Sequence, residues 1–439
     1  MLLFLAIIGG AYASVITTSE LTAQITVQGG LEFLSQSQSS KIDSVRAELF
    51  LFPRTSSSQI VNSLTTKPQA QMSEVSVQYS WNKPENTMTY ELLAVVNTHE
   101  AERVKTKEKY PIQEIPEEIM QFLQPSKIIT STDSRIREQA NSIASGTDDL
   151  FIVVTRLADW TKKNIAYNLS SLTAEVAQSA SWVIEHKEGV CDELTSLFIA
   201  MLRSLGIPGR FVSGLSHSNS PLVPNNWGSH GWAEVWFPNT GWVSFDPTFG
   251  QYGWIDAGHI KLKENIDPSE KSVQFVWQAR DMQVKTKPLT MTGKVLQEGR
   301  KKKSELAISI KPLHDQIGFG SANVIQVQIK NLQNNYVASH IRLASSLELS
   351  IEMPEQLAIL APQSETTLSW LVQVNKGLQQ SFSYSIPLLA MSELNETGNA
   401  MLFVAENLPV YTKKEMKDEL LIEQPSKTLS CTISPAEIM

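Results

Sequence analysis

Cysteine is scarce in this chain: among 439 residues only Cys191 and Cys431 occur. One pair of cysteines cannot supply a disulfide framework, so stability must come from hydrophobic cores, which a chain of this length can bury. Long apolar runs are also lacking. Beyond the first residues no stretch approaches the roughly 20 apolar residues of a membrane-spanning helix, so the sequence predicts no integral membrane span.

An excess of basic residues is missing as well. Lys and Arg together number 37 against 45 Asp and Glu, which gives a net charge of −8. A protein without a broad basic surface is a poor partner for nucleic acid, and the one basic run, Arg300 to Lys303, is typical of a solvated linker. No loop of alternating acidic residues has calcium-ligand spacing. We therefore expect no nucleic acid partner, no metal and no cofactor.

The N-terminus has the pattern of an export signal. Leu2 to Ile8 are apolar, and Ala11-Tyr12-Ala13 is a small-x-small motif of the kind found at cleavage sites. This pattern predicts a signal peptide over residues 1–13 and an extracytoplasmic protein, secreted or associated with the cell surface. Because no Lys or Arg precedes the apolar run, an N-terminal strand or a truncated start is the alternative.

The remaining chain divides by its periodicity into β-rich flanks and a mixed centre. Alternating apolar and polar residues predict a β-sandwich-like domain over 14–125, and helical spacing begins soon after Pro125. A mixed core over 126–265 precedes a β-rich linker over 266–303. Five alternating segments then predict an immunoglobulin-like β-sandwich over 304–410, followed by a short charged helix and a tail over 411–439. The predicted fold class is α+β.

Cys191 lies at the predicted start of a helix. Gly189-Val190 precedes it, Gly206 and Pro208 end the helix, and the apolar residues between recur at helical spacing: Leu194, Leu197, Phe198, Met201, Leu202 and Leu205. Unpaired N–H groups and the positive dipole end at such a position favour a thiolate over a thiol. The same N–H groups can stabilise the oxyanion of an attacked carbonyl. Cys191 is therefore a candidate nucleophile that must stay reduced, which leaves Cys431 unpaired.

His230 and Asp246 lie on two predicted strands joined by Pro238-Asn239-Thr240-Gly241. Since side chains alternate along strands, the loop length decides whether the two residues share a face. A two-residue turn would separate them. We predict a three-residue loop, Asn239 to Gly241, with Gly241 left-handed, or a bulge there. Either puts His230 and Asp246 together, where Asp246 can orient His230 and His230 can accept the thiol proton.

These segments together resemble the core of the transglutaminase-like superfamily, which comprises papain-like cysteine acyltransferases and hydrolases. The resemblance rests on Gly189-Val-Cys191, Leu202 to Arg210, His230 to Trp236 and Gly241 to Thr248, and Lys163 to Tyr167 upstream is also similar. It covers residues 130 to 265 and implies a papain-like fold with Cys191, His230 and Asp246 as catalytic residues. It also implies a thioester intermediate on a protein or peptide substrate. Many non-eukaryotic members act as hydrolases, so the resemblance favours hydrolysis over cross-linking.

A different class of function is a cell-surface scaffold or adhesion protein that retains the core as a binding module, and the flanking β-domains favour it. The oligomeric state is left open.

For several other residues of the core, the sequence allows either a packing role or a functional role. Trp182 is a weak candidate for the side chain of the oxyanion hole, and Glu234 and Arg203 are each expected in a buried ion pair. His217 is expected to be a solvated loop residue, and the alternative is that its loop is a lid over the site that lets it contact substrate. Five tryptophans crowd the hairpin and are expected mainly to pack: Trp227, Trp232, Trp236, Trp242 and Trp254.

Overall fold

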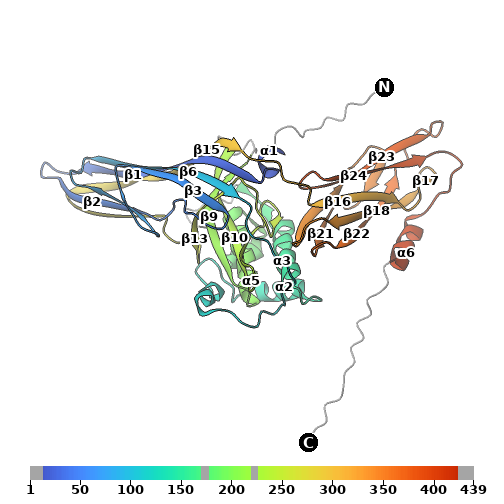
Figure 1. The fold of residues 1–439 in the computed structure, drawn as a ribbon, viewed down its shortest axis with the longest axis horizontal. Helices are drawn as coiled ribbons and strands as arrows, with labels where there is room; N and C mark the ends of the chain where they lie inside the picture. The colour runs from blue at the N-terminus through green and yellow to red at the C-terminus, as the bar shows by residue number, and fades with distance from the viewer. Residues whose placement is uncertain (1–12, 170–176, 219–225, 424–439) are drawn as a thin grey trace, which may run out of the picture. The chain divides into compact units, whose positions relative to one another are not determined.

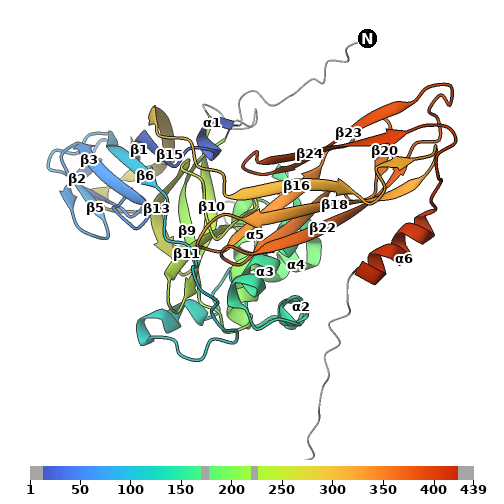
Figure 2. The same cartoon turned by 45° about the vertical axis from the view of Figure 1, so that its right-hand side comes forward.

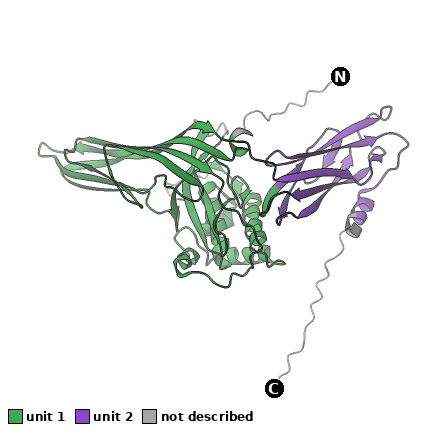
Figure 3. Cartoon of the chain, in the orientation of Figure 1, with its two compact units in different colours: residues 1–304, 333–339 green, residues 305–332, 340–439 purple. Residues whose placement is uncertain are grey.

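The computed structural model describes residues 13–169, 177–218 and 226–423 (Figure 1). The chain forms two compact units, one of residues 1–304 with 333–339 and the other of residues 305–332 with 340–439 (Figure 3). The predicted signal peptide lies outside the described residues except for Ala13, which begins the short helix α1 (Ala13–Ile16). Cys431 also lies outside them.

The first unit begins with two four-stranded sheets, ordered β15-β1-β6-β3 and β14-β2-β5-β4. Their strands are β1 (Glu20–Ser35), β2 (Lys41–Leu49), β3 (Gln59–Lys67), β4 (Gln71–Met72), β5 (Val77–Trp81), β6 (Thr87–His99), β14 (Val273–Arg280) and β15 (Met282–Glu298). Every second side chain of β6 from Met88 to Thr98 is buried, as expected for strands that cover a core with one face. Within the N-terminal β-domain predicted over 14–125, the strands run from Glu20 to His99, after the short helix α1.

The prediction of a linker over 266–303 is wrong. β15 pairs with β1 from Met282 to Glu298, and β14 pairs with β2 along its length. The N-terminal β-region therefore combines strands that precede the central region in the sequence with strands that follow it. Alternation along β14 and β15 could be seen in the sequence, but strand partners more than 200 residues away could not.

The central region contains four helices, a 3-10 turn and a five-stranded sheet. They are η1 (Glu117–Leu123), α2 (Ser134–Ala144), α3 (Leu150–Asn164), α4 (Ala180–His186), α5 (Cys191–Ser204), β9 (Gly209–His217), β10 (Trp227–Phe237), β11 (Gly241–Asp246), β12 (Gln251–Tyr252) and β13 (His259–Asn265). The sheet order is β12-β11-β10-β9-β13, and β7 (Ala166–Tyr167) pairs separately with β8 (Glu188–Gly189). Asp133 and Asp149 are the N-caps of α2 and α3, and their side chains accept hydrogen bonds from backbone N–H groups in the first turn of each helix.

Helix α5 is the centre of this region. From Glu193 to Arg203 every residue is buried, and the helix packs against α2, α3, α4, β9 and β10 (Figure 2). A helix buried on all sides keeps its position because each face is fixed by a different neighbour. One further hydrophobic cluster joins Leu215, Trp227 and Ile260 of the central sheet to β1 and β6. The central sheet and the N-terminal β-region thus share a core.

The second unit consists of two β-sheets and a terminal helix. One sheet has the order β16-β18-β22-β20 and the other β17-β24-β23-β19-β21. Their strands are β16 (Leu306–Pro312), β17 (Gln316–Ile317), β18 (Ala322–Asn331), β19 (Val337–Leu343), β20 (Leu349–Ile351), β21 (Glu355–Leu360), β22 (Glu365–Val374), β23 (Tyr384–Ser392) and β24 (Thr397–Val404). The short helix predicted after Thr412 is α6 (Lys413–Glu423). It is not part of a loose tail, because Met416 is fully buried against Ala322 and Val324. In the described part of the chain, no helix is long and apolar enough to cross a membrane.

Candidate active site

Cys191 is the first residue of α5, as predicted, and its side chain is half-buried. Val190 precedes the helix in extended conformation, and its N–H donates a 3.0 Å hydrogen bond to Glu193 Oε2. This contact uses one of the backbone donors at the helix start and leaves others near the sulfur.

Strand β10 is fixed against the same end of α5. Thr195, one helical turn after Cys191, donates its hydroxyl to the carbonyl of Gly231 at 3.0 Å. A Cβ on Gly231 would lie 2.4 Å from Phe211 Cζ and 2.6 Å from Asp192 Oδ1, so only glycine permits this approach. The approach brings His230, the neighbour of Gly231, to the tip of α5.

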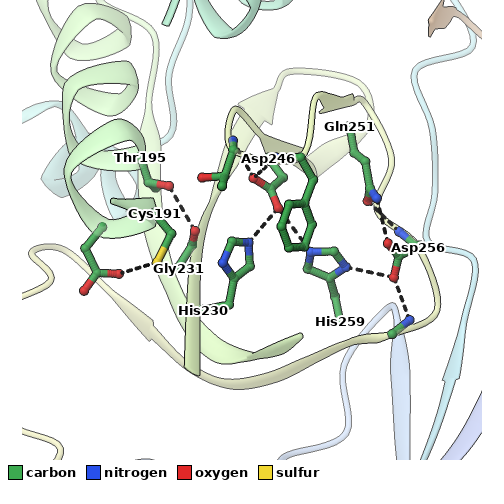
Figure 4. A network of polar contacts seen from close by, with 12 residues as sticks. Cys191, Thr195, His230, Gly231, Asp246, Gln251, Asp256 and His259 are labelled. Carbon is green, nitrogen blue, oxygen red and sulfur yellow. Dashed lines mark hydrogen bonds and ion pairs between the residues drawn. The ribbon is translucent and has the colours of Figure 1, made fainter. Parts of the chain in front are cut away.

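His230 and Asp246 share a face of the sheet, as predicted. His230 Nε2 lies 2.7 Å from Asp246 Oδ2 (Figure 4). In the β10–β11 hairpin Phe237 pairs with Gly241 and Glu234 with Ser244, so the loop is Pro238 to Thr240. The loop has the predicted odd length but begins one residue earlier than predicted, and Gly241 is left-handed with φ 86°.

The imidazole of His230 is held by aromatic rings. Phe249 stacks on it with ring centroids 4.6 Å apart and planes 10° from parallel, and Trp232 lies on the same strand at 6.1 Å. Because Nε2 faces Asp246, Nδ1 is the ring nitrogen that remains to exchange a proton with a thiol.

Asp246 accepts four hydrogen bonds in a fully buried position. The N–H groups of Thr248 and Phe249 donate to Oδ1 at 2.7 and 3.1 Å, and His230 and His259 face Oδ2. Burial alone would raise the pKa of this carboxyl, but the charge and hydrogen bond of His230, with those of His259, outweigh burial and hold the pKa well below its usual range. Asp246 is therefore ionised at neutral pH.

The thiol of Cys191 does not have the lowered pKa expected of a helix start. Burial, and then the neighbouring carboxyl of Asp192, raise its pKa well above the ordinary value, and only a hydrogen bond from the N–H of Gly231 opposes them. The thiol lies 3.6 Å from Asp192 Oδ1, to which it donates. A sulfur in these surroundings rests as a neutral thiol and requires a nearby base to become a nucleophile.

Tyr167 is the site residue that the sequence did not single out by itself. Strand β7 pairs Tyr167 with Gly189, and the Tyr167 hydroxyl accepts a hydrogen bond from the backbone N–H of Cys191. Tyr167 is about half exposed. Its partial burial and the nearby Cys191, Asp192 and Asp246 raise the pKa of this phenol, so it stays protonated. The only signal was the similarity of the Lys163 to Tyr167 segment to the family pattern. Trp182, the weak candidate, lies in α4 and stacks on His186 at 4.2 Å.

Two buried charged residues of the core are structural. Glu234 pairs with Arg210 at 2.6 Å and Lys261 at 2.5 Å, which confirms the predicted ion pair. Arg203 was also expected in an ion pair, but its guanidinium donates to the backbone carbonyls of Gly209, Gln124 and Ile266. Three carbonyls satisfy its donors as well as a carboxylate would.

The predicted role of His217 is wrong. It ends strand β9 and packs edge-on against Trp227, with ring centroids 5.2 Å apart. The expectation that most of the hairpin tryptophans pack the core is confirmed. Four of the five are buried, and Trp242 instead lies under the guanidinium of Arg210.

A cavity of about 460 Å³ opens beside His230. Among its lining residues are Lys162, Tyr167, Leu194, Ser229, His230 and Phe249. Apolar walls with a few polar groups are typical of a pocket that receives a side chain or peptide segment.

His259 extends the polar network beyond the predicted residues. Its Nε2 lies 3.2 Å from Asp246 Oδ2 and its Nδ1 lies 3.1 Å from Asp256 Oδ1 (Figure 4). Donor atoms of His230, Asp246 and His259 all lie within 4.8 Å of one another, a spacing that a metal ion could bridge. Both imidazoles are already hydrogen-bonded to Asp246, so we interpret the cluster as an acid–base network.

Comparison with known proteins gives the core a family. Residues 137–247 match the model of the transglutaminase-like superfamily. The uncharacterized protein YebA of Bacillus subtilis is 32% identical over 133 residues, which are 27% of this chain and 18% of YebA. A protein-glutamine gamma-glutamyltransferase of Pseudomonas aeruginosa is 27% identical over 103 residues, 22% of this chain and 15% of that protein. A solved structure of a candidate cysteine protease from Cytophaga hutchinsonii has a TM-score of 0.48 and 18% identity, covering 64% of this chain and 93% of that one.

The chain spans less than half the length of these curated relatives. The matched segments make up 27%, 29% and 22% of this chain.

Proposed function

Because residues 137–247 form a core of the transglutaminase-like superfamily, we propose that this chain is a thiol-dependent enzyme acting on an amide of a protein or peptide. Cys191 is the nucleophile, His230 the general base and then the general acid, and Asp246 the residue that orients His230. We favour hydrolysis over cross-linking, as the resemblance to non-eukaryotic members does.

One observation carries the proposal. Buried His230, whose Nε2 lies 2.7 Å from Oδ2 of Asp246, is on the strand whose Gly231 N–H donates to the sulfur of Cys191. A base fixed by a carboxylate beside a thiol at a helix start is the arrangement that thiol acyl transfer requires.

The chemistry proceeds in two stages. The thiol proton moves to Nδ1 of His230 as the sulfur attacks the carbonyl carbon. The amide nitrogen then leaves with that proton and a thioester remains. In the second stage His230 accepts a proton from water or from a primary amine as it attacks the thioester. The thiolate leaves and regains a proton from His230, which releases an acid or a new amide.

We assign the oxyanion site to the N–H of Cys191 and the hydroxyl of Tyr167. In the substrate-free structure the Tyr167 oxygen accepts from this N–H. A carbonyl oxygen that takes the place of the phenol as acceptor would find the N–H free and the phenol, still protonated, close enough to donate. The Pseudomonas aeruginosa relative is named for transfer at protein glutamine, so a glutamine side-chain amide is the first substrate to try.

The N-terminal pattern supports an extracytoplasmic site of action, secreted or at the cell surface. Leu2 to Ala13 has the apolar run and small residues of an export signal, and amide substrates in proteins or peptides are available there.

The test is incubation with glutamine-containing peptides, with and without a primary amine, followed by mass spectrometry. Ammonia loss to water, peptide cleavage and amine incorporation produce three different masses. Cys191→Ser should abolish whichever product forms, whereas Cys431→Ser, the matched control, should leave it unchanged. Equal products from Cys191→Ser and the native chain would refute the assignment.

The raised pKa of Cys191 favours the second candidate, a scaffold that keeps the core as a binding module. Labelling with an electrophilic thiol probe separates the two functions. A scaffold predicts that Cys191 reacts no faster than an ordinary thiol, and an enzyme predicts enhanced labelling that His230→Ala removes.

A further inference from the structure

We propose that His259 is a positioning residue of the active site, a protonated imidazolium that bridges Asp246 and Asp256 and keeps Asp246 ionised and aimed at His230. This inference rests on the proposed function of Cys191, His230 and Asp246, and adds the side chains of His259 and Asp256 to the same machinery.

The hydrogen bonds of His259 identify its protonation state. Both ring nitrogens face carboxylate oxygens, Nε2 at 3.2 Å from Asp246 and Nδ1 at 3.1 Å from Asp256. A neutral imidazole has one N–H and would set its bare nitrogen against a carboxylate. Only the imidazolium donates to both. The side chain is fully buried, so water cannot replace either partner.

Asp256 is itself held rigidly. Gln251 donates to its Oδ2 at 2.6 Å, the N–H of Gly258 donates to Oδ1 at 2.8 Å, and the N–H of Asp256 donates back to Gln251 Oε1 at 2.8 Å. Gln251 pairs with Asp246 across β11 and β12. The two carboxylates that hold His259 therefore belong to one short loop.

The N-terminal β-region fixes the backbone around His259. Thr98 of β6 donates its hydroxyl to the carbonyl of Ala257 at 2.7 Å. Gln59 of β3 forms two hydrogen bonds with the backbone of Lys261, at 2.8 and 2.9 Å. These contacts come from elements outside residues 137–247, which gives the flanking sheets a part in the acid–base network.

Charge balance explains why a cation is retained in the protein interior. With His259 protonated, one positive charge lies between two negative carboxylates, and the network becomes neutral when His230 accepts the thiol proton. Asp256 and Asp246 raise the pKa of His259 to about 10 against the opposing effect of burial, and His259 in turn lowers the pKa of Asp256. Other charged or titratable groups also face this network. They are His230 on β10, His217 on β9, Cys191 and Asp192 on α5, Tyr167 on β7, Lys162 on α3, and Glu100, Glu102 and Arg103 around a small cavity lined also by His259.

The consequence for catalysis is a shift in the working pH. The rings of His230 and His259 lie 5.5 Å apart, so the charge on His259 opposes further protonation of the Cys191–His230 pair. Its removal should move both limbs of the pH profile to higher pH. For a unit charge at that distance, with an effective dielectric constant of about 20, the interaction is about 3 kcal/mol and the move is roughly two pH units.

The experiment measures the rate of Cys191 alkylation by iodoacetamide from pH 5 to 10 in the full chain carrying Cys431→Ser. We expect His259→Gln to slow alkylation at pH 6 about tenfold or more and to move the profile to higher pH by roughly two units. His259→Lys, which restores the charge, should bring the limbs back toward their original positions. His186→Gln, an exposed matched control, should overlay the parent profile.

An unmoved profile in a folded His259→Gln variant would refute the positioning role. Should that variant fail to fold in thermal unfolding, the 15N resonances of His259 in the unmutated chain decide instead. Two protonated ring nitrogens from pH 7 to 9 support the inference, and a neutral ring at pH 7 overturns it. A different result would refute the proposed function: alkylation of Cys191 in the parent chain no faster than that of free cysteine, with no change in this rate in His230→Ala.

Discussion

Replacing Asp246 by Asn tests the hydrogen bond between Asp246 and His230 with almost no change in side-chain shape. Asp246 Oδ1 accepts from the N–H groups of Thr248 and Phe249, and Oδ2 accepts from His230 and His259. An amide has only one oxygen. If that oxygen keeps the two backbone donors, the NH₂ group faces Nε2 of His230, which must then become an acceptor.

The change of Nε2 from donor to acceptor determines how much activity is lost. When Nε2 accepts, the proton of a neutral imidazole sits on Nδ1, and the nitrogen available to the thiol can no longer take a proton. In serine proteases an Asp→Asn change at the equivalent position lowers kcat about 10⁴-fold through the wrong tautomer. We expect a loss of about 10³ to 10⁴-fold here, together with lower thermal stability because His259 loses one carboxylate.

The assay is the rate of Cys191 alkylation at pH 7 in the Cys431→Ser background, with thermal unfolding followed by circular dichroism. Asp43→Asn, on the exposed face of β2, provides the matched control and should match the parent chain in both measurements. Native-like labelling of Asp246→Asn, in a folded protein, would refute the tautomer argument.

The remaining predictions concern three other contacts. Gly231→Ala should slow labelling of Cys191 and destabilise the fold by about 1 to 3 kcal/mol, since its Cβ would lie 2.4 Å from Phe211; equal melting temperatures would contradict this. Glu234→Gln leaves Arg210 and Lys261 buried without their shared carboxylate and should cost about 3 to 5 kcal/mol in urea unfolding; a cost below 1 kcal/mol would contradict it. Stability from His259 should be complete below pH 6.5 and lost as pH rises toward 10, because its folded-state pKa is raised from 6.5 to about 10, a difference worth roughly 5 kcal/mol. The stability gap between parent and His259→Gln should therefore narrow over that range, and a constant gap would disprove it.

The β10–β11 hairpin shows which structural features can be predicted from residues close together in the sequence. The turn residues before Gly241 predicted a hairpin but left both an even and an odd loop open. The odd loop that we predicted puts His230 and Asp246 on one face, and it begins one residue earlier than expected. The start and end of α5 were equally readable from Gly189, Gly206 and the apolar spacing. Such features depend on residues within a few positions of each other.

His259 and Tyr167 were not found in this way. No sequence pattern around His259 indicates a functional role. Asp246 and Asp256 come into contact with it only after β13 pairs with β9 and the loop after β11 folds back. The thiol pKa was likewise misjudged. A helix start favours a thiolate, but burial and Asp192 act in the opposite direction, and burial is a property of the folded chain.

The sequence by itself determined the elements of the core, their order, and Cys191, His230 and Asp246 as the candidates for chemistry, since periodicity, caps and turns are local. Only the tertiary structure decided that residues 266–303 complete the N-terminal sheets, that α6 packs on the second unit, and that Asp246 lies between two imidazoles. Each of these depends on pairing across long stretches of chain, where the free energy comes from contacts that no local pattern encodes.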